Sequence, residues 1–177
     1  MKILAIITSL LLLTSCASSE TQDSYSVPKN CEDTKVLAAF PDSIPNPKFI
    51  DTPWEPAEGT DLYAAINNGG LACSYGIQEA EIGATILWAP NDDNLFENRA
   101  KEWQGFGQQV IDLPDVDETS AYVLTEGTQG EGEYHVWAIN YLINGIWIQI
   151  NATFFSSIDD ALPIIKAAAN SLSVNES

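Results

Sequence analysis

The chain has 177 residues, a length that fits one domain with a substantial hydrophobic core. Its 25 acidic and 7 basic residues give a net charge of −18. A surface of this charge repels nucleic acid and anionic lipid headgroups, so we expect neither nucleic-acid binding nor electrostatic docking on a membrane. Solubility alone is a sufficient reason for the acidity.

The N-terminus resembles the signal sequence of a bacterial lipoprotein. Lys2 precedes an uncharged apolar run at residues 3–13, and small residues lead up to Cys16. The run is far shorter than the about 20 residues that span a bilayer, which predicts that residues 1–15 are a removed export signal. Cys16 is then the lipidated first residue, and we expect the protein at the cell membrane, anchored on the extracytoplasmic face. An ordinary secretory signal with a chance cysteine is the alternative.

Residues 16–30 are predicted to be the lipidated cysteine and a flexible tether, because they are rich in Ser, Thr, Asp and Gln. Residues 31–177 are predicted to form a single globular domain. The two other cysteines, Cys31 and Cys73, make an even pair in a chain predicted to reach an oxidising compartment, so we expect them to form a disulfide. A free reactive thiol is the alternative.

The first half of the domain is predicted to hold two short helices and a strand pair. Five prolines make the segment after the first helix an extended loop. Thr60 is a suitable cap for the second helix, and the turn Asn68-Gly69-Gly70 ends it. In chain order the expected elements are a helix at 31–40, a loop at 41–56, a helix at 61–67, and strands at 71–77 and 82–88.

The second half is predicted to hold an amphipathic helix, a strand, a hairpin and a closing helix. Apolar residues at spacings of three and four indicate the helix at 93–109. A strand is expected at 119–126. Asn144-Gly145 lies between two apolar runs and predicts a two-residue type I′ turn within 134–155. Ser157 and Asp160 resemble a capping box for the last helix.

The turn also predicts which hairpin residues share a face. Pairing Ile143 with Ile146 places Trp137, Ile139 and Tyr141 on one apolar face. A strand with one apolar and one mixed face is typical of an antiparallel sheet. The fold class is therefore predicted as α+β, an antiparallel β-sheet meander packed by an amphipathic helix and a C-terminal helix, with one disulfide.

The sequence offers little catalytic machinery. His135 is the single histidine, and no Gly-x-Ser-x-Gly motif supplies a nucleophile. We therefore predict no catalytic residue, no metal and no cofactor. Calcium binding by carboxylates stays open at residues 91–94 and at 112–118, although neither segment matches an EF-hand loop and the first is also a suitable helix cap.

The mixed face of the hairpin is the predicted ligand-binding surface. Its candidate residues are Asn140, Trp147, Gln149 and Asn151, which combine an indole with three amide side chains. Trp137, on the other face, is predicted to lie in the core. A helix that covers the mixed face is the alternative.

Residues 68–75, Asn-Gly-Gly-Leu-Ala-Cys-Ser-Tyr, contain a Gly-Gly-x-x-Cys-x-aromatic motif. With the earlier Cys31 and a closing helix, the chain resembles small secreted actinobacterial lipoproteins of unknown function. It is similar in layout to the extracellular sensor domains of mycobacterial-type serine/threonine kinases, but it has no second pair of cysteines for another disulfide. The resemblance implies a bridge between Cys31 and Cys73, an antiparallel sheet packed by helices, and a binding or accessory role with no catalytic residue to carry over.

These observations predict a membrane-tethered lipoprotein that acts as a non-catalytic binding or accessory module for an envelope protein or small ligand. The lipid is its expected contact with the membrane. A carboxylate-based hydrolase of cell-envelope polymers is the alternative, and it requires two facing acidic side chains in a pocket. A purely structural lipoprotein with a broad apolar patch is the third hypothesis.

Overall fold

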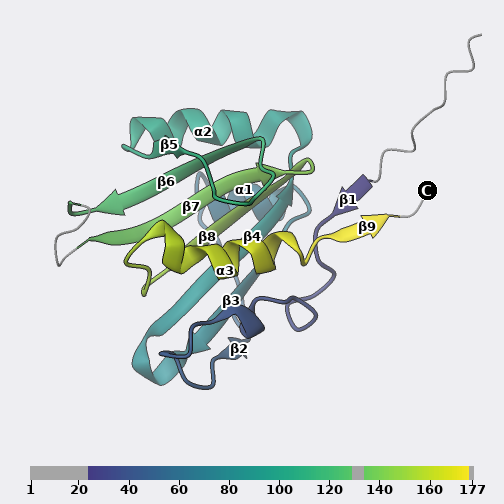
Figure 1. Ribbon diagram of the computed structural model, residues 1–177. Helices are drawn as coiled ribbons and strands as arrows, with labels where there is room; N and C mark the ends of the chain where they lie inside the picture. The colour runs from purple at the N-terminus through teal and green to yellow at the C-terminus, as the bar shows by residue number, and fades with distance from the viewer. Residues whose placement is uncertain (1–23, 129–133, 176–177) are drawn as a thin grey trace, which may run out of the picture.

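The computed structural model describes residues 24–128 and 134–175, and it confirms the α+β fold class. A seven-stranded antiparallel sheet lies between two helices on one face and one helix on the other (Figure 1). The strand order is β2-β3-β4-β8-β7-β6-β5. The strands are β2 (Lys48–Ile50), β3 (Leu71–Ile77), β4 (Ile82–Pro90), β5 (Gln109–Ile111), β6 (Ser120–Glu126), β7 (His135–Ile143) and β8 (Ile146–Ala152).

The two faces of the sheet are buried by different helices. Helix α3 (Ile158–Ala169) packs on the larger core, which includes Ile86, Tyr141 and Ile148. We call this the α3 face. Helices α1 (Asp61–Asn67) and α2 (Leu95–Gly105) pack on the opposite side, the α1–α2 face. Among the described residues, no helix is long and apolar enough to span a membrane.

The predicted hairpin register is confirmed over most of its length. Ile143 pairs with Ile146, Tyr141 with Ile148, and Ile139 with Ile150. Asn144 and Gly145 both have positive φ, as a type I′ turn requires. The turn chemistry of two residues thus sets which side chains of both strands face α3.

Trp137 breaks this pattern, and the prediction that it lies in the core is wrong. The pairing of β6 with β7 shifts at this point, from Leu124 opposite Ala138 to Thr125 opposite Val136. Trp137 is therefore the extra residue of a β-bulge, which re-aims a side chain. Val136 is buried in the larger core, whereas Trp137 is 37% exposed.

The N-terminal boundaries differ from the prediction. Residues Ser24–Ser26, which fall within the predicted tether at 16–30, form strand β1 and pair with β9 (Ser173–Asn175). Tyr25 and Val27 pack against the core, which the polar composition of the segment concealed. The expected helix at 31–40 is only the short 3₁₀ turn η1 (Leu37–Ala39). The signal at 1–15 and Cys16 lie outside the described residues.

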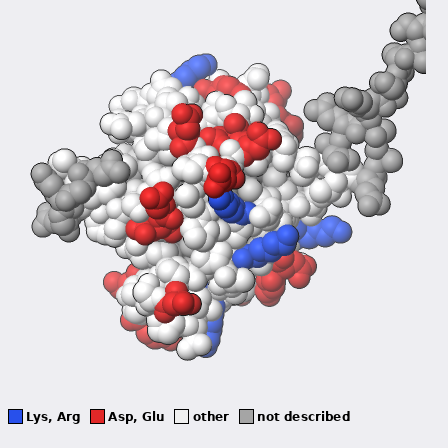
Figure 2. Space-filling model, viewed as in Figure 1, with Lys and Arg blue, Asp and Glu red and all other residues white. Residues whose placement is uncertain are grey.

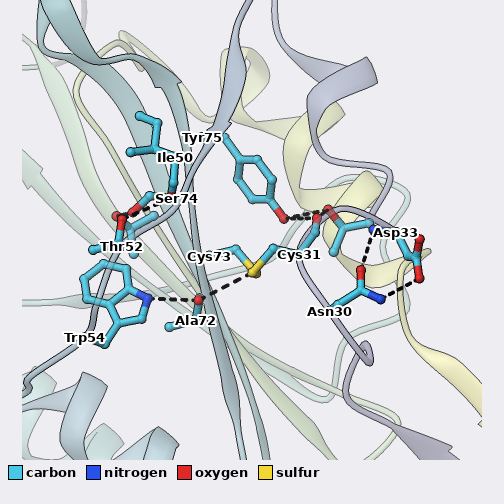
Figure 3. The surroundings of a disulfide bond; sticks show 12 residues. Asn30, Cys31, Asp33, Ile50, Thr52, Trp54, Ala72, Cys73, Ser74 and Tyr75 are labelled. Atoms are coloured by element: carbon cyan, nitrogen blue, oxygen red, sulfur yellow. Dashed lines mark hydrogen bonds between the residues drawn. A yellow bond between two sulfur atoms is a disulfide. The ribbon is translucent and has the colours of Figure 1, made fainter.

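The disulfide between Cys31 and Cys73 is present (Figure 3). Its Cα atoms are 5.6 Å apart, within the usual range for a disulfide. It joins the N-terminal segment to the start of β3. Next to the bridge, the Tyr75 hydroxyl donates to the Cys31 carbonyl oxygen at 2.9 Å. The bridge therefore holds the segment before β2 against the sheet.

Tyr141 makes the stability of the fold sensitive to alkaline pH. Its hydroxyl donates to the Ile165 carbonyl oxygen at 2.8 Å, and burial raises its pKa well above the usual value. The unfolded chain loses this proton near pH 10, while the folded chain keeps it. We expect stability to be unaffected below pH 10 and to fall above it, by at most about 1.4 kcal/mol per pH unit from this residue.

Urea unfolding between pH 8 and pH 11.5 checks this expectation. The Tyr141→Phe variant should show a shallower alkaline slope than the parent protein. Burial also raises the pKa of Tyr75, so the slope is reduced and not abolished. Equal slopes for the two proteins would contradict the role of Tyr141.

Candidate ligand-binding site

Three of the four predicted ligand-binding residues lie beneath helices. Asn140 and Trp147 are completely buried, and Gln149 is 5% exposed. The apolar side of α2 packs on them, with the Trp103 ring 5.3 Å from the Trp147 ring. The prediction that these residues form an exposed surface is therefore corrected, and the covering helix is the arrangement observed. The physical reason is that α2 needs an apolar partner, which Trp147 and its neighbours supply.

Their polar groups are used inside the protein. Asn140 Oδ1 accepts from Trp147 Nε1 at 3.0 Å and from Gln149 Nε2 at 2.8 Å. Gln149 Nε2 also donates to Asp61 Oδ2 at 2.6 Å. Trp103 Nε1 donates to the same carboxylate at 2.9 Å. Buried amides that satisfy one another in this way stabilise the interface between sheet and helices, and none of them is directed at a ligand.

Asn151 differs because it lies beyond the cover of the helices. It belongs to a row of directly paired residues that crosses six strands on the α1–α2 face. Most of these side chains are only half-buried. The row runs in spatial order through Ile50, Ser74, Thr85, Asn151, Ala138 and Leu124. One half of this face is thus closed by α1 and α2, and the other half is open.

The open half is hollowed. A cavity of about 480 Å³ lies over it, a volume in the range of small-molecule sites. Gly76 and Gly83 face each other across β3 and β4, so no side chain fills the position beside Ser74 and Thr85. A Cβ on Gly76 would lie 2.2 Å from the Ile82 carbonyl oxygen, so only glycine fits there. Apolar side chains border the cavity, among them Ile50, Ile77, Ile82 and Trp137. Hydroxyl and amide groups lie at its floor, from Ser74, Thr85, Asn151 and Thr153.

Trp137 forms one wall of the cavity. Its indole Nε1 donates to Glu126 Oε2 at 2.8 Å, which fixes the orientation of the ring. The His135 imidazole stacks on one side of the ring at a centroid distance of 5.0 Å. A ligand therefore meets the other side or the edge of the indole. The bulge in β7 is what brings this aromatic ring to the open half of the face.

Charge is sparse in the lining of the cavity. Glu81 is the one acidic side chain among the lining residues, and no Lys, Arg or His is among them. The predicted hydrolase alternative needs a pair of facing carboxylates, which this cavity does not offer. Elsewhere in residues 24–128 and 134–175, no group of three His, Cys, Asp or Glu side chains is arranged to hold a metal ion.

One side chain from each segment considered for calcium has a local hydrogen-bonding role. Asn91 Oδ1 accepts from the Phe96 backbone N–H at 2.7 Å and so caps α2. Glu118 Oε1 accepts from the Leu113 backbone N–H at 2.8 Å. Both side chains thus stabilise local turns.

Sequence reasoning identified one residue of this site, Asn151, and missed the rest. The bulge at Trp137 has no local sequence signature, because it depends on how β6 pairs with β7. Ile50 lies in a three-residue strand between prolines. The glycines at 76 and 83 are the one signal available, since isolated glycines within strands indicate close approach of another group.

Comparisons with known proteins add no relative: no protein-family model matches the chain, and no curated protein or solved structure matches it.

Proposed function

We propose that this protein is a lipid-anchored, extracytoplasmic binding module without a catalytic role, which holds a small envelope ligand in the cavity over the open half of the sheet. The observation that carries the proposal is the cavity itself. It combines apolar walls with a few hydrogen-bonding groups at its floor, which is the usual composition of a ligand site. The floor lies on central strands, so its geometry is fixed by the sheet.

The charge of the protein restricts the ligand. The net charge of the chain is −18, and acidic side chains are spread over the α3 face seen in Figure 2. On the opposite face, the lining of the cavity contains Glu81 and no basic group. An anionic ligand would therefore enter without a counter-charge. This favours an uncharged or positively charged ligand and disfavours phosphate compounds and nucleic acid.

The position of the anchor fits the same proposal. Lipidation at Cys16 would attach the chain to the membrane a few residues before β1. Strand β1 lies at the right of Figure 1, whereas the turn between β3 and β4, which borders the cavity, lies at the lower left. An anchored domain would in this way carry its cavity at the end of the sheet remote from the point of attachment.

Site-specific photo-crosslinking tests the proposed site. A photoreactive amino acid replaces Ile82, which is 36% exposed at the cavity, or Val174, which is 51% exposed in β9. Both variants are expressed in the native membrane and illuminated, and their adducts are identified by mass spectrometry. We expect a defined adduct at position 82 and none at position 174. Identical adducts at both positions, or none at position 82, would contradict the proposed site.

A separate experiment tests the lipid anchor. In the parent protein, mass spectrometry of the N-terminal peptide should find residues 1–15 removed and a lipid mass on Cys16, and the Cys16→Ser variant should lack that mass. A parent chain that carries no lipid mass at Cys16 would contradict the lipid anchor. The protein would then reach the membrane in another way, and the proposed position of the cavity relative to the membrane would fall with the anchor.

A further inference from the structure

We propose that the cavity binds a neutral saccharide, with a sugar ring stacked on Trp137 and its hydroxyl groups bonded to the floor. This inference rests on the proposed function and names its ligand class. It comes from three properties of the same site: a fixed indole platform, a row of small polar side chains, and a lining that carries no positive charge.

The platform is preorganised. Trp137 is oriented by the Glu126 carboxylate and supported from one side by His135. A ring held in this way loses little conformational entropy when a ligand packs against it. The indole offers a flat apolar surface, and the C–H face of a pyranose ring is a flat apolar surface of matching shape. The 37% exposure of Trp137 leaves it accessible.

The floor of the cavity supplies both hydrogen-bond donors and hydrogen-bond acceptors. The Ser74 and Thr85 hydroxyls are 3.5 Å apart and lie next to Asn151 in the row. Asn151 Nδ2 donates to Gln149 Oε1 at 3.0 Å, and within the described residues no group donates to Asn151 Oδ1. Hydroxyls both donate and accept, while the amide oxygen accepts. These groups match the hydroxyls along one edge of a sugar.

The charges select a neutral ligand over an ionic one. An acidic sugar would meet Glu81 and no basic side chain. An ammonium group would lose its water against Ile50, Ile82 and Ala152, which border the same cavity, and this desolvation is costly. The Glu126 carboxylate is already engaged by the Trp137 indole. A neutral polyhydroxylated ring avoids both penalties.

Calorimetric titration of the full lipoprotein in detergent tests this inference. The probes are cellohexaose and N-acetylchitohexaose as neutral chains, chitosan hexaose as the cationic counterpart, and hexagalacturonate as an anionic chain. We expect a neutral chain to bind more tightly than the cationic and anionic chains. Trp137→Ala should weaken that binding by at least about tenfold, and Trp137→Phe by less.

Phe106→Ala is the matched control. Phe106 is 79% exposed at the end of α2 and does not border the cavity, so its removal should leave the affinity unchanged. Thermal melts of each variant establish that the fold is intact before titration.

The outcomes separate the ligand class from the site. If neither neutral chain binds, if the cationic chain binds more tightly, or if Trp137→Ala binds as the parent does, the saccharide inference is overturned. The proposed function survives that result when the adduct at position 82 still forms. Absence of both the adduct and saccharide binding overturns both.

Discussion

Replacing Asp61 with alanine is expected to lower the free energy of unfolding by about 2 to 4 kcal/mol. The carboxylate accepts from Arg99, from the Trp103 indole and from the Gln149 amide, so a single side chain joins α1, α2 and β8. Without it, the Trp103 indole loses its acceptor, while Arg99 and Gln149 each lose one of the acceptors that they have. Partial exposure of Asp61 and Arg99, at 20% and 13%, lets water compensate in part and keeps the loss below that of a fully buried pair.

The same guanidinium provides the matched control. Arg99 also pairs with Glu102 at 2.7 Å, but the Glu102 side chain is 54% exposed. Glu102→Ala should therefore cost less than about 0.5 kcal/mol. Urea unfolding followed by tryptophan fluorescence compares the two variants. Similar losses of stability for Asp61→Ala and Glu102→Ala would contradict this prediction. They would show that Asp61 contributes no more than an exposed ion pair with Arg99, and that its hydrogen bonds to Trp103 and Gln149 add nothing measurable.

Asp61→Asn separates charge from hydrogen bonding. Asparagine keeps one oxygen acceptor at this position but has no negative charge to pair with Arg99. We expect a loss between those of the two alanine variants. A loss as large as that of Asp61→Ala would mean that the charge contributes nearly all of the stabilisation.

Local signals account for the parts of the fold that the sequence predicted. Asn144-Gly145 determines its own turn, and alternation then assigns the faces of β7 and β8 as far as Ile139. Thr60 caps α1, with its hydroxyl accepting from the Tyr63 backbone N–H at 3.2 Å. Ser157 caps α3 in the same way through Asp160. Each of these features depends on residues only a few positions apart.

The missed features depend on distant partners. The three-residue strands β2 and β5 exist because β3 and β6 pair with them, and their own sequences are too short to indicate a strand. Asn140 and Gln149 have the composition of an exposed surface, yet they pair with each other beneath α2. Amide side chains buried in pairs cannot be distinguished from exposed ones by type alone. The predicted site therefore lies on the covered half of the α1–α2 face, whereas the cavity lies over its open half.

Reduction of the disulfide between Cys31 and Cys73 is the second change with a large expected effect. The two cysteines are 42 residues apart, and closing a loop of this length stabilises the fold by about 4 kcal/mol in the chain-entropy account. The bridge also holds a segment whose Val36 is completely buried in the larger core. When the disulfide is reduced, we expect the segment around Cys31 and Val36 to detach from the α3 face as one cooperative unit.

The measurement is thermal unfolding with and without a reductant. We expect reduction to lower the melting temperature by about 10 °C in a domain of this size. A Cys31→Ala, Cys73→Ala double variant should melt near the reduced protein and show no further response to reductant. Tyr75→Phe in the oxidised protein provides a comparison, because it removes one hydrogen bond to Cys31 and leaves the covalent bridge.

Each possible result identifies what holds the N-terminal segment. If the oxidised and reduced proteins melt together, side-chain packing alone keeps the segment in place, and the chain-entropy argument fails for this loop. If the reduced protein is destabilised but the cavity still binds its ligand, the bridge stabilises the α3 face without shaping the open half of the other face. This second result is the one we expect, because Cys73 points to the larger core while Ser74, its neighbour on β3, points to the cavity.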